Sequence, residues 1–251
     1  MQESIISSFP KCHSTPQVSC SQCRLNTLCL PIAMHVEEVD KVDSIIQRGR
    51  PIHKGEFLFH GEDTFSAVYA VRSGCIKTVT ISGEGQEQVT GFYLPGEILG
   101  MDGIALGKHT NSAVALETSA ICEIPFSHLE SLSSEIPSLQ RHVFQLLGKE
   151  IAVDQQLITL LSKNSADERV ATLLLSISSR NSRRNLSSTH FRLPMSRAEI
   201  GNYLGLTVET VSRVLSRLQK NMMIAADKKE ITLLDIPRLR ELAQGTVNEK
   251  A

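Results

Sequence analysis

Three cysteines stand close together near the N-terminus, in the segment CSQCRLNTLCLP at residues 20–31. Cys20 and Cys23 form a Cys-x2-Cys pair, and Cys29 follows within the same short segment. The chain contains six cysteines, so half of them fall within ten residues. Thiols grouped in this way bind a metal ion or an iron–sulfur cluster, or they form a redox-active disulfide. This segment is therefore the first candidate for chemistry.

The spacing limits which of these sites can form. A zinc ribbon needs a second Cys-x2-Cys or paired histidines at short spacing, and neither follows here; the Cys-x3-Cys-x2-Cys spacing of radical-SAM enzymes is also absent. A [4Fe–4S] cluster takes four thiolates, so the fourth would come from Cys12, Cys75 or Cys122. Strand alternation around Cys75 predicts a buried, inert thiol, and Cys12 lies in a Ser- and Pro-containing tail. Zinc and a thiol–disulfide switch remain open alternatives.

Composition and charge bound the class of protein. The 251 residues suffice for two domains, and 41% hydrophobic with 21% charged residues is typical of a soluble globular protein. No apolar run reaches the roughly 18 residues of a membrane span, and the N-terminus lacks the features of a secretory signal, which predicts a cytoplasmic protein. Residues 1–165 carry 12 Lys+Arg against 18 Asp+Glu, whereas residues 166–251 carry 14 against 9. The basic C-terminal part is expected to contact a polyanion.

The middle of the chain changes its hydrophobic period twice. Residues 37–48 have apolar residues at helical spacing, and residues 51–127 then form short β-rich runs separated by Gly-containing turns, which predicts an antiparallel barrel or roll. Residues 137–162 return to helical periodicity and predict a long helix that packs on its own domain or on a second copy. Its apolar stripe, interrupted by one carboxylate, consists of Val143, Leu147, Ile151, Asp154, Ile158 and Leu161.

The C-terminal part contains two short helical segments around a glycine. After a predicted helix at residues 167–181, Ser196 and Glu199 form an S-x-x-E capping box. Gly205 marks a tight turn, and Thr207 can cap a second helix. The segment MMIAADKKEITLLDI then alternates around a charged turn, as in a hairpin. This arrangement predicts a helix-turn-helix followed by a wing.

The second of these helices would enter the major groove of DNA with its N-terminal residues at the base edges. Its exposed face carries Glu209, Ser212 and Arg213. Arginine suits guanine O6 and N7, glutamate suits cytosine N4, and serine reaches a base or the backbone. Three further basic residues are better placed for phosphates, namely Arg197, Arg217 and Lys220.

The roll, the long helix and the stretch MSRAEIGNYLGLTVETVSRVLSRLQK together resemble the CRP/FNR superfamily of bacterial transcription regulators. With CSQCRLNTLC and the distant AICEIP, the resemblance narrows to the oxygen-responsive FNR group. It implies an α+β fold: an N-terminal β-roll of the cyclic-nucleotide-binding jelly-roll type, a long dimerisation helix and a C-terminal winged helix-turn-helix. The expected divisions are a cluster-ligand segment at 1–30, a sensory roll at 31–138, a dimerisation helix at 139–163 and a DNA-binding domain at 164–251.

The same resemblance implies a function. Cys122 matches the remote ligand of the group and would complete a [4Fe–4S] site with Cys20, Cys23 and Cys29. O2 would convert that cluster to [2Fe–2S] and then to apo protein, and the anaerobic homodimer would bind a TTGAT–ATCAA palindrome in double-stranded DNA. Contacts to RNA polymerase are expected near residues 81–86, Thr118 and Ser187. No enzyme is expected, because no nucleotide-binding Gly loop, G-x-S-x-G or H-E-x-x-H motif occurs.

Two further expectations concern the sensor and the switch. Cyclic-nucleotide members of the superfamily hold the phosphate with a Gly-Glu pair and a later arginine. Gly96-Glu97 was expected to be that pair, whereas Asn111 stands where the arginine should be, so a cyclic-nucleotide response is the alternative function. In the long helix, two Asp154 carboxylates meeting at a two-fold axis would repel each other and oppose dimerisation, unless Asp154 is merely solvated at the rim of the stripe.

Overall fold

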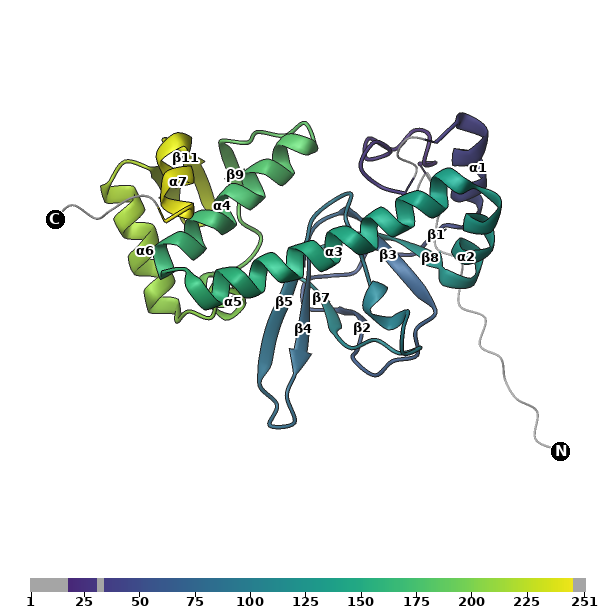
Figure 1. Ribbon diagram of the computed structural model, residues 1–251, viewed down its shortest axis with the longest axis horizontal. Coiled ribbons are helices and arrows are strands. Elements are labelled where there is room, and N and C mark those ends of the chain that lie inside the picture. Colours follow the sequence, from purple (N-terminus) through teal and green to yellow (C-terminus); the bar gives the residue numbers. More distant parts are fainter. Residues whose placement is uncertain (1–17, 31–33, 246–251) are drawn as a thin grey trace.

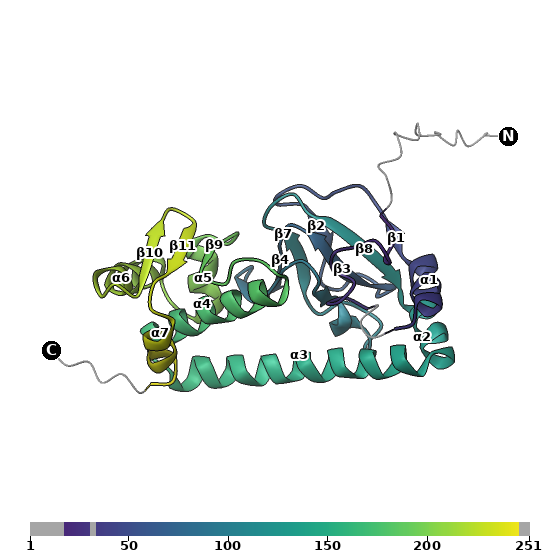
Figure 2. The ribbon, with the colours of Figure 1, turned by 90° about the horizontal axis from the view of Figure 1, so that it is seen from above.

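The computed structural model describes residues 18–30 and 34–245. An N-terminal β-roll and a C-terminal helical unit lie side by side, and the long helix α3 (Pro137–Lys163) runs beneath both (Figures 1 and 2). This arrangement confirms the predicted fold class. No helix in the described part of the chain is both long and apolar enough to cross a membrane.

The roll consists of two four-stranded antiparallel sheets, ordered β1-β8-β3-β6 and β2-β7-β4-β5. Apolar side chains pack between the sheets, and Ile76, Leu99 and Ala113 are almost completely buried there. The 3-10 helix η1 (Met101–Gly103) follows β6. The strands are β1 (Gln47–Arg48), β2 (Phe57–Phe59), β3 (Ala67–Ser73), β4 (Ile76–Ile81), β5 (Glu87–Tyr93), β6 (Ile98–Leu99), β7 (Ser112–Ala115) and β8 (Ala120–Pro125).

The elements around the roll differ from the prediction at two places. Helix α1 (Val36–Ile45) ends before residue 48, because the backbone at Ile46 is extended and the next two residues pair with β8. Helix α2 (Phe126–Glu135) was not predicted. It buries only Leu129 and Leu132 on one face, and this short pattern is a weak signal in the sequence.

The C-terminal unit contains the predicted winged helix-turn-helix. Ser196 accepts from the Glu199 amide, Thr207 accepts from the Thr210 amide, and Gly205 has φ of 63°, a left-handed conformation that suits glycine. The wing has three strands rather than the predicted two, in the order β10-β11-β9. The elements are α4 (Ala166–Arg183), β9 (His190–Arg192), α5 (Arg197–Leu204), α6 (Val208–Lys220), β10 (Ile224–Asp227), β11 (Glu230–Leu233) and α7 (Ile236–Ala243).

The C-terminal unit contacts the roll through the edge of β5. Asn202 of α5 accepts from the Val89 amide at 2.5 Å and donates to the Glu87 carbonyl at 2.7 Å. Gln88 in turn donates to the Asn202 carbonyl at 2.7 Å. A helix of the helix-turn-helix thus satisfies backbone groups at a sheet edge, which otherwise remain unpaired.

Close packing in the helix-turn-helix can be tested at Gly201. A Cβ added there would lie 2.5 Å from the Leu206 carbonyl oxygen, which belongs to the backbone of the turn. We expect Gly201→Ala to lower the free energy of unfolding by about 1–3 kcal/mol, the range typical of overpacking. Gly148→Ala on α3, where an added Cβ meets nothing within 4 Å, is the control and should stabilise by up to about 1 kcal/mol. Chemical denaturation measures both, and an unchanged midpoint for Gly201→Ala would contradict the packing argument.

Candidate thiol centre and nucleic-acid interface

The four cysteines predicted as ligands line one small cavity. Cys20, Cys23 and Cys29 come from the N-terminal loop, and Cys122 comes from β8. The register of the sheet places Cys122 between Arg48 of β1 and Ala70 of β3. The cavity is otherwise largely apolar, with Leu25, Ile46, Ala70 and Val71 in its wall. Residues almost a hundred positions apart in the chain are therefore brought to one place by strand pairing.

Burial keeps two of these thiols protonated in the absence of a bound cation. It raises the pKa of Cys20 to about 12, with the Asp43 carboxylate adding to the shift, and the pKa of Cys29 also to about 12. The pKa of Cys122 is raised by burial and lowered by the guanidinium groups of Arg48 and Arg72. Metal ligation requires deprotonated thiols, so a bound group has to supply positive charge to stabilise the thiolates.

Arg48 provides a cation in the wall of the same cavity. Its side chain is 10% exposed and forms an ion pair with Asp43. Nη2 lies 3.5 Å from Cys20 Sγ, and the guanidinium also hydrogen-bonds Cys122. Its Nε is buried and has no partner among the described residues. A buried N–H of this kind calls for an acceptor, and four thiolates with iron and sulfide would form an anionic, sulfur-rich group that fits this position.

The thiols face one space without converging on a single point. Within residues 18–30 and 34–245, no three His, Cys, Asp or Glu side chains are placed to hold one metal ion. A tetrahedral zinc site requires such convergence, with Zn–S distances of about 2.3 Å. The donor set, four cysteines with no histidine, is that of a [4Fe–4S] cluster.

The other two cysteines take no part in this cavity. Cys75 is fully buried in the core, and burial raises the pKa of its thiol well above the ordinary range. This agrees with the prediction that it is inert. Cys12 lies outside the described residues.

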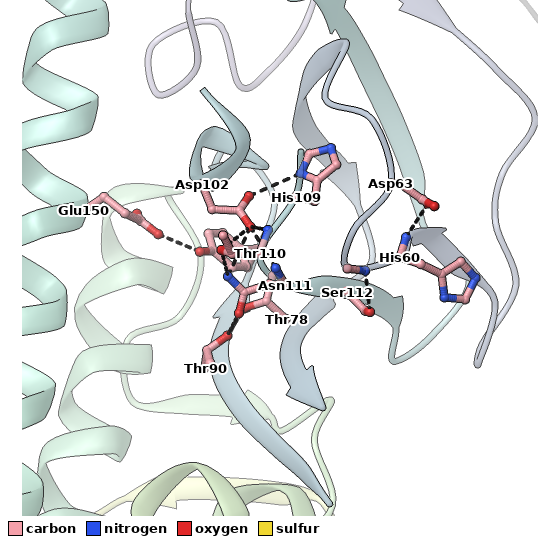
Figure 3. Close-up of polar contacts among 12 residues, drawn as sticks. His60, Asp63, Thr78, Thr90, Asp102, His109, Thr110, Asn111, Ser112 and Glu150 are labelled. Carbon is pink, nitrogen blue, oxygen red and sulfur yellow. Dashed lines mark hydrogen bonds and ion pairs between the residues drawn. The ribbon is translucent and has the colours of Figure 1, made fainter. Parts of the chain in front are cut away.

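A second, larger groove of about 710 Å³ lies between α3, the roll and α5. Figure 3 shows the polar network on its roll side. Asp102 Oδ2 accepts from the backbone amides of Thr110 and Asn111 at 2.8 and 2.9 Å, and from Asn111 Nδ2 at 3.1 Å; Asn111 Oδ1 in turn accepts from Thr90 Oγ1 at 2.9 Å. The groove is lined by the carboxylates of Asp102, Glu150 and Asp154 and, among the described residues, by no Lys, Arg or His. A cyclic phosphate would meet negative charge there with no guanidinium to oppose it.

The expected role of Gly96-Glu97 in this groove is wrong. Glu97 lines a different pocket, together with Lys149 and Arg180. Its Oε1 accepts from Arg180 Nε at 2.7 Å, so it links the roll to α4. The turn beside Asn111 is instead Gly100 with Asp102, because η1 begins there. A Gly-Glu dipeptide is too short a pattern to locate one turn among several in the roll.

The structure places the predicted DNA-reading residues at the start of α6. Glu209 and Arg213 are exposed and Ser212 is half-buried. Arg197 Nη1 donates to Ser212 Oγ at 3.2 Å, so the proposed phosphate contact adjoins the reading face. Lys220 is exposed at the end of the helix. Arg217 forms an ion pair with Asp167 of α4, in which its Nε donates at 2.8 Å.

The long helix exposes a seam with heptad spacing. Phe144, Ile151 and Ile158 are 59–67% exposed and lie seven residues apart. Three residues after each come the remaining members, Leu147, Asp154 and Leu161. This is the a and d pattern of a coiled coil, with Asp154 at a central d position. Val143, predicted in the stripe, packs against its own roll instead, and Phe144 was missed.

Glu150 was also missed by the sequence analysis. It lies one turn before Asp154 and accepts a hydrogen bond from the Tyr93 hydroxyl at 2.6 Å (Figure 3). Burial raises its pKa, and the Asp154 carboxylate adds to the shift. Burial also raises the pKa of Asp154. The seam thus carries two neighbouring carboxylates, which repel each other at i,i+4 spacing. That spacing was the signal available in the sequence.

Family models match both parts of the chain. The model described as Crp-like helix-turn-helix domain matches residues 168–242, and the cyclic nucleotide-binding domain matches residues 49–135. The transcriptional activator protein anr of Pseudomonas aeruginosa is 51% identical over 94% of this chain and 96% of its own. The fumarate and nitrate reduction regulatory protein of Escherichia coli K12 is 46% identical over 92% of each chain. The chain belongs to the CRP/FNR family of transcription regulators.

A solved structure agrees with this membership. FixK2 from Bradyrhizobium japonicum is 29% identical, covers 79% of this chain and 97% of its own, and superposes with a TM-score of 0.72. CRP/FNR regulators bind DNA through the helix-turn-helix, so the chain is a DNA-binding regulator and not an enzyme. Within the family, the acidic lining of its groove distinguishes it from members that hold a cyclic phosphate with arginine.

Proposed function

We propose that this protein is an oxygen-responsive transcription regulator of the cytoplasm whose activity depends on a [4Fe–4S] cluster. The observation that carries the proposal is the cavity in which all four cysteines of the motif set face Arg48 and its unpartnered Nε. The fumarate and nitrate reduction regulatory protein of Escherichia coli, similar over nearly the whole length, supports it. In this scheme residues 1–30 supply ligands, 31–138 the sensory roll, 139–163 the dimerisation helix and 164–251 the DNA-binding domain.

Cys20, Cys23, Cys29 and Cys122 would hold the cluster. When bound, it would supply an O2-sensitive link between the N-terminal loop and β8. Arg48 would balance the negative charge of the thiolates, and Leu25 and Leu30, which are almost fully buried, would keep water from the loop. Loss of this link would free the loop from a strand that leads directly into α2 and α3.

Dimerisation would convert that change into DNA binding. The seam on α3 can pair with a second copy along Phe144, Ile151 and Ile158. A two-fold axis would then set the two α6 helices at one-turn spacing for a palindrome of the TTGAT–ATCAA type. Three exposed surfaces of the dimer would remain available to RNA polymerase, at residues 81–86, Thr118 and Ser187.

The first prediction concerns the cluster. Protein prepared without air should contain about four iron and four sulfide per chain, as ligation by four thiolates requires. Cys20→Ser, Cys23→Ser, Cys29→Ser or Cys122→Ser should remove both, whereas the control Cys75→Ser should keep them. Iron and acid-labile sulfide analysis measures the result. Stoichiometric zinc, or full iron in Cys122→Ser, would show that the ligand set is wrong.

The second prediction concerns the seam. Asp154→Ala should form dimers in air without any cluster, because it removes the like charge at the central d position. Ile151→Ala should weaken the dimer even when the cluster is present, through loss of buried apolar area. Analytical ultracentrifugation distinguishes the two. A monomeric Asp154→Ala protein in air would mean that this charge does not oppose association.

The third prediction concerns DNA reading. Arg213→Ala should weaken binding to the palindrome by about 1–3 kcal/mol and relax the preference at the guanine that it contacts. Arg197→Ala should weaken binding to all sequences alike and reduce the salt dependence. Titrations of matched and mutated duplexes at several salt concentrations test this. Equal losses on every duplex for both variants would remove α6 from the reading role.

A further inference from the structure

A basic pocket of about 40 Å³ lies on the opposite side of the Cys20–Cys29 loop from the thiols, where the loop, the roll, α3 and α4 meet. Its wall includes Leu28 of the loop, the turn at Pro95 and Gly96, and Lys149 of α3. The end of α4 and the residue after it contribute three arginines, Arg180, Arg183 and Arg184. Neither the proposed cluster nor the DNA-reading face uses this pocket.

Arg184 shows that the pocket lacks an acceptor from the protein. Its Nη2 donates to Asn181 Oδ1, but Nε and Nη1 are buried and have no partner among the described residues. Burial of an unpaired guanidinium donor costs more than burial of a neutral one. The pKa of Arg184 is lowered, by burial first and by Arg180 and Arg183 as well. The helix dipole explains cations at the end of α4, but it does not supply acceptors for these two N–H groups.

The charge balance in the pocket is strongly positive. Glu97 is the only carboxylate in its wall, and Arg180 engages both of its oxygens. Lys149 and Arg183 are exposed at the rim. The volume is about three times the roughly 10–15 Å³ that one water needs. A group with several acceptor oxygens and two negative charges fits this space and this charge.

We propose that the pocket binds a tetrahedral oxyanion of the phosphate type, with Arg184 as its principal donor and Lys149 as a second cation. A ligand there would connect three parts of the molecule. It would contact α4 of the DNA-binding unit, α3, and the turn at Gly96 on which Leu28 packs, since a Cβ at Gly96 would lie 3.2 Å from Leu28 Cβ. Oxyanion binding would therefore stabilise the docked arrangement of the DNA-binding unit on the roll and the cysteine loop.

Calorimetric titration of the purified, cluster-free full chain with inorganic phosphate, at constant ionic strength set by chloride, tests the proposal. We expect one site per chain with a millimolar or tighter Kd and a rise in Tm with phosphate concentration. Arg184→Gln should weaken binding at least tenfold. Lys149→Gln, an exposed change that leaves the core intact, should weaken it several-fold.

Two controls separate this pocket from other basic surfaces. Arg192→Gln removes an arginine that pairs with Glu117 outside the pocket, and Arg213→Gln removes one from the DNA-reading face. Both should bind phosphate like the unchanged chain. Equal affinity in all four variants, or no saturable binding, would overturn the proposal. A parallel titration with glycerol 3-phosphate identifies the source: binding as tight as inorganic phosphate indicates a phosphoryl group on a larger molecule, and weaker binding indicates the free ion, each with the same loss in Arg184→Gln.

Discussion

The pairing of β8 with two strands at once controls the geometry of the sensor. β8 lies between β1 and β3, so each residue along it is held by antiparallel partners on both sides. Cys122 is thereby fixed opposite Arg48 on one side and Ala70 on the other. The strand ends at Pro125, where α2 begins, and α3 follows after Ile136. A thiol, a buried guanidinium and the start of the dimerisation helix therefore share one rigid segment.

Charge is segregated in the molecule in a way that suits this arrangement. The groove that faces α3 is lined by carboxylates, whereas the pocket beside the cysteine loop is lined by arginines. Asn111 spends its amide on Asp102 and Thr90, so the roll satisfies its own polar groups at the place where arginine would hold a phosphate. The roll has kept the jelly-roll architecture while its central groove became unfavourable for anions. Signal reception has its best-supported position at the thiol cavity.

The sequence contained much of this, but unevenly. Long-period features were predictable: the helix α3, the capping box at Ser196 and the turn at Gly205 follow from local rules of spacing and caps. Features that depend on pairing between distant segments were not. The role of Arg48 follows from its register opposite Cys122, and β9 joins the wing only because residues 190–192 meet β11. The mistaken position of Gly96-Glu97 has the same cause, since a dipeptide carries no information on which turn faces which helix.

The seam on α3 shows why a small structural change can act as a switch. Fully burying an isoleucine or phenylalanine contributes about 1.5–3 kcal/mol, and only three such residues, Phe144, Ile151 and Ile158, are exposed along it. Two carboxylates about 4 Å apart at an effective dielectric near 20 repel by roughly 4 kcal/mol, and Glu150 adds negative charge one turn away. The losses of translational and rotational freedom on association oppose the dimer further. Favourable and unfavourable contributions are thus of similar size. Moving an equilibrium from 1:99 to 99:1 takes about 5.5 kcal/mol, an amount that reorientation of one helix at a seam so closely balanced can supply.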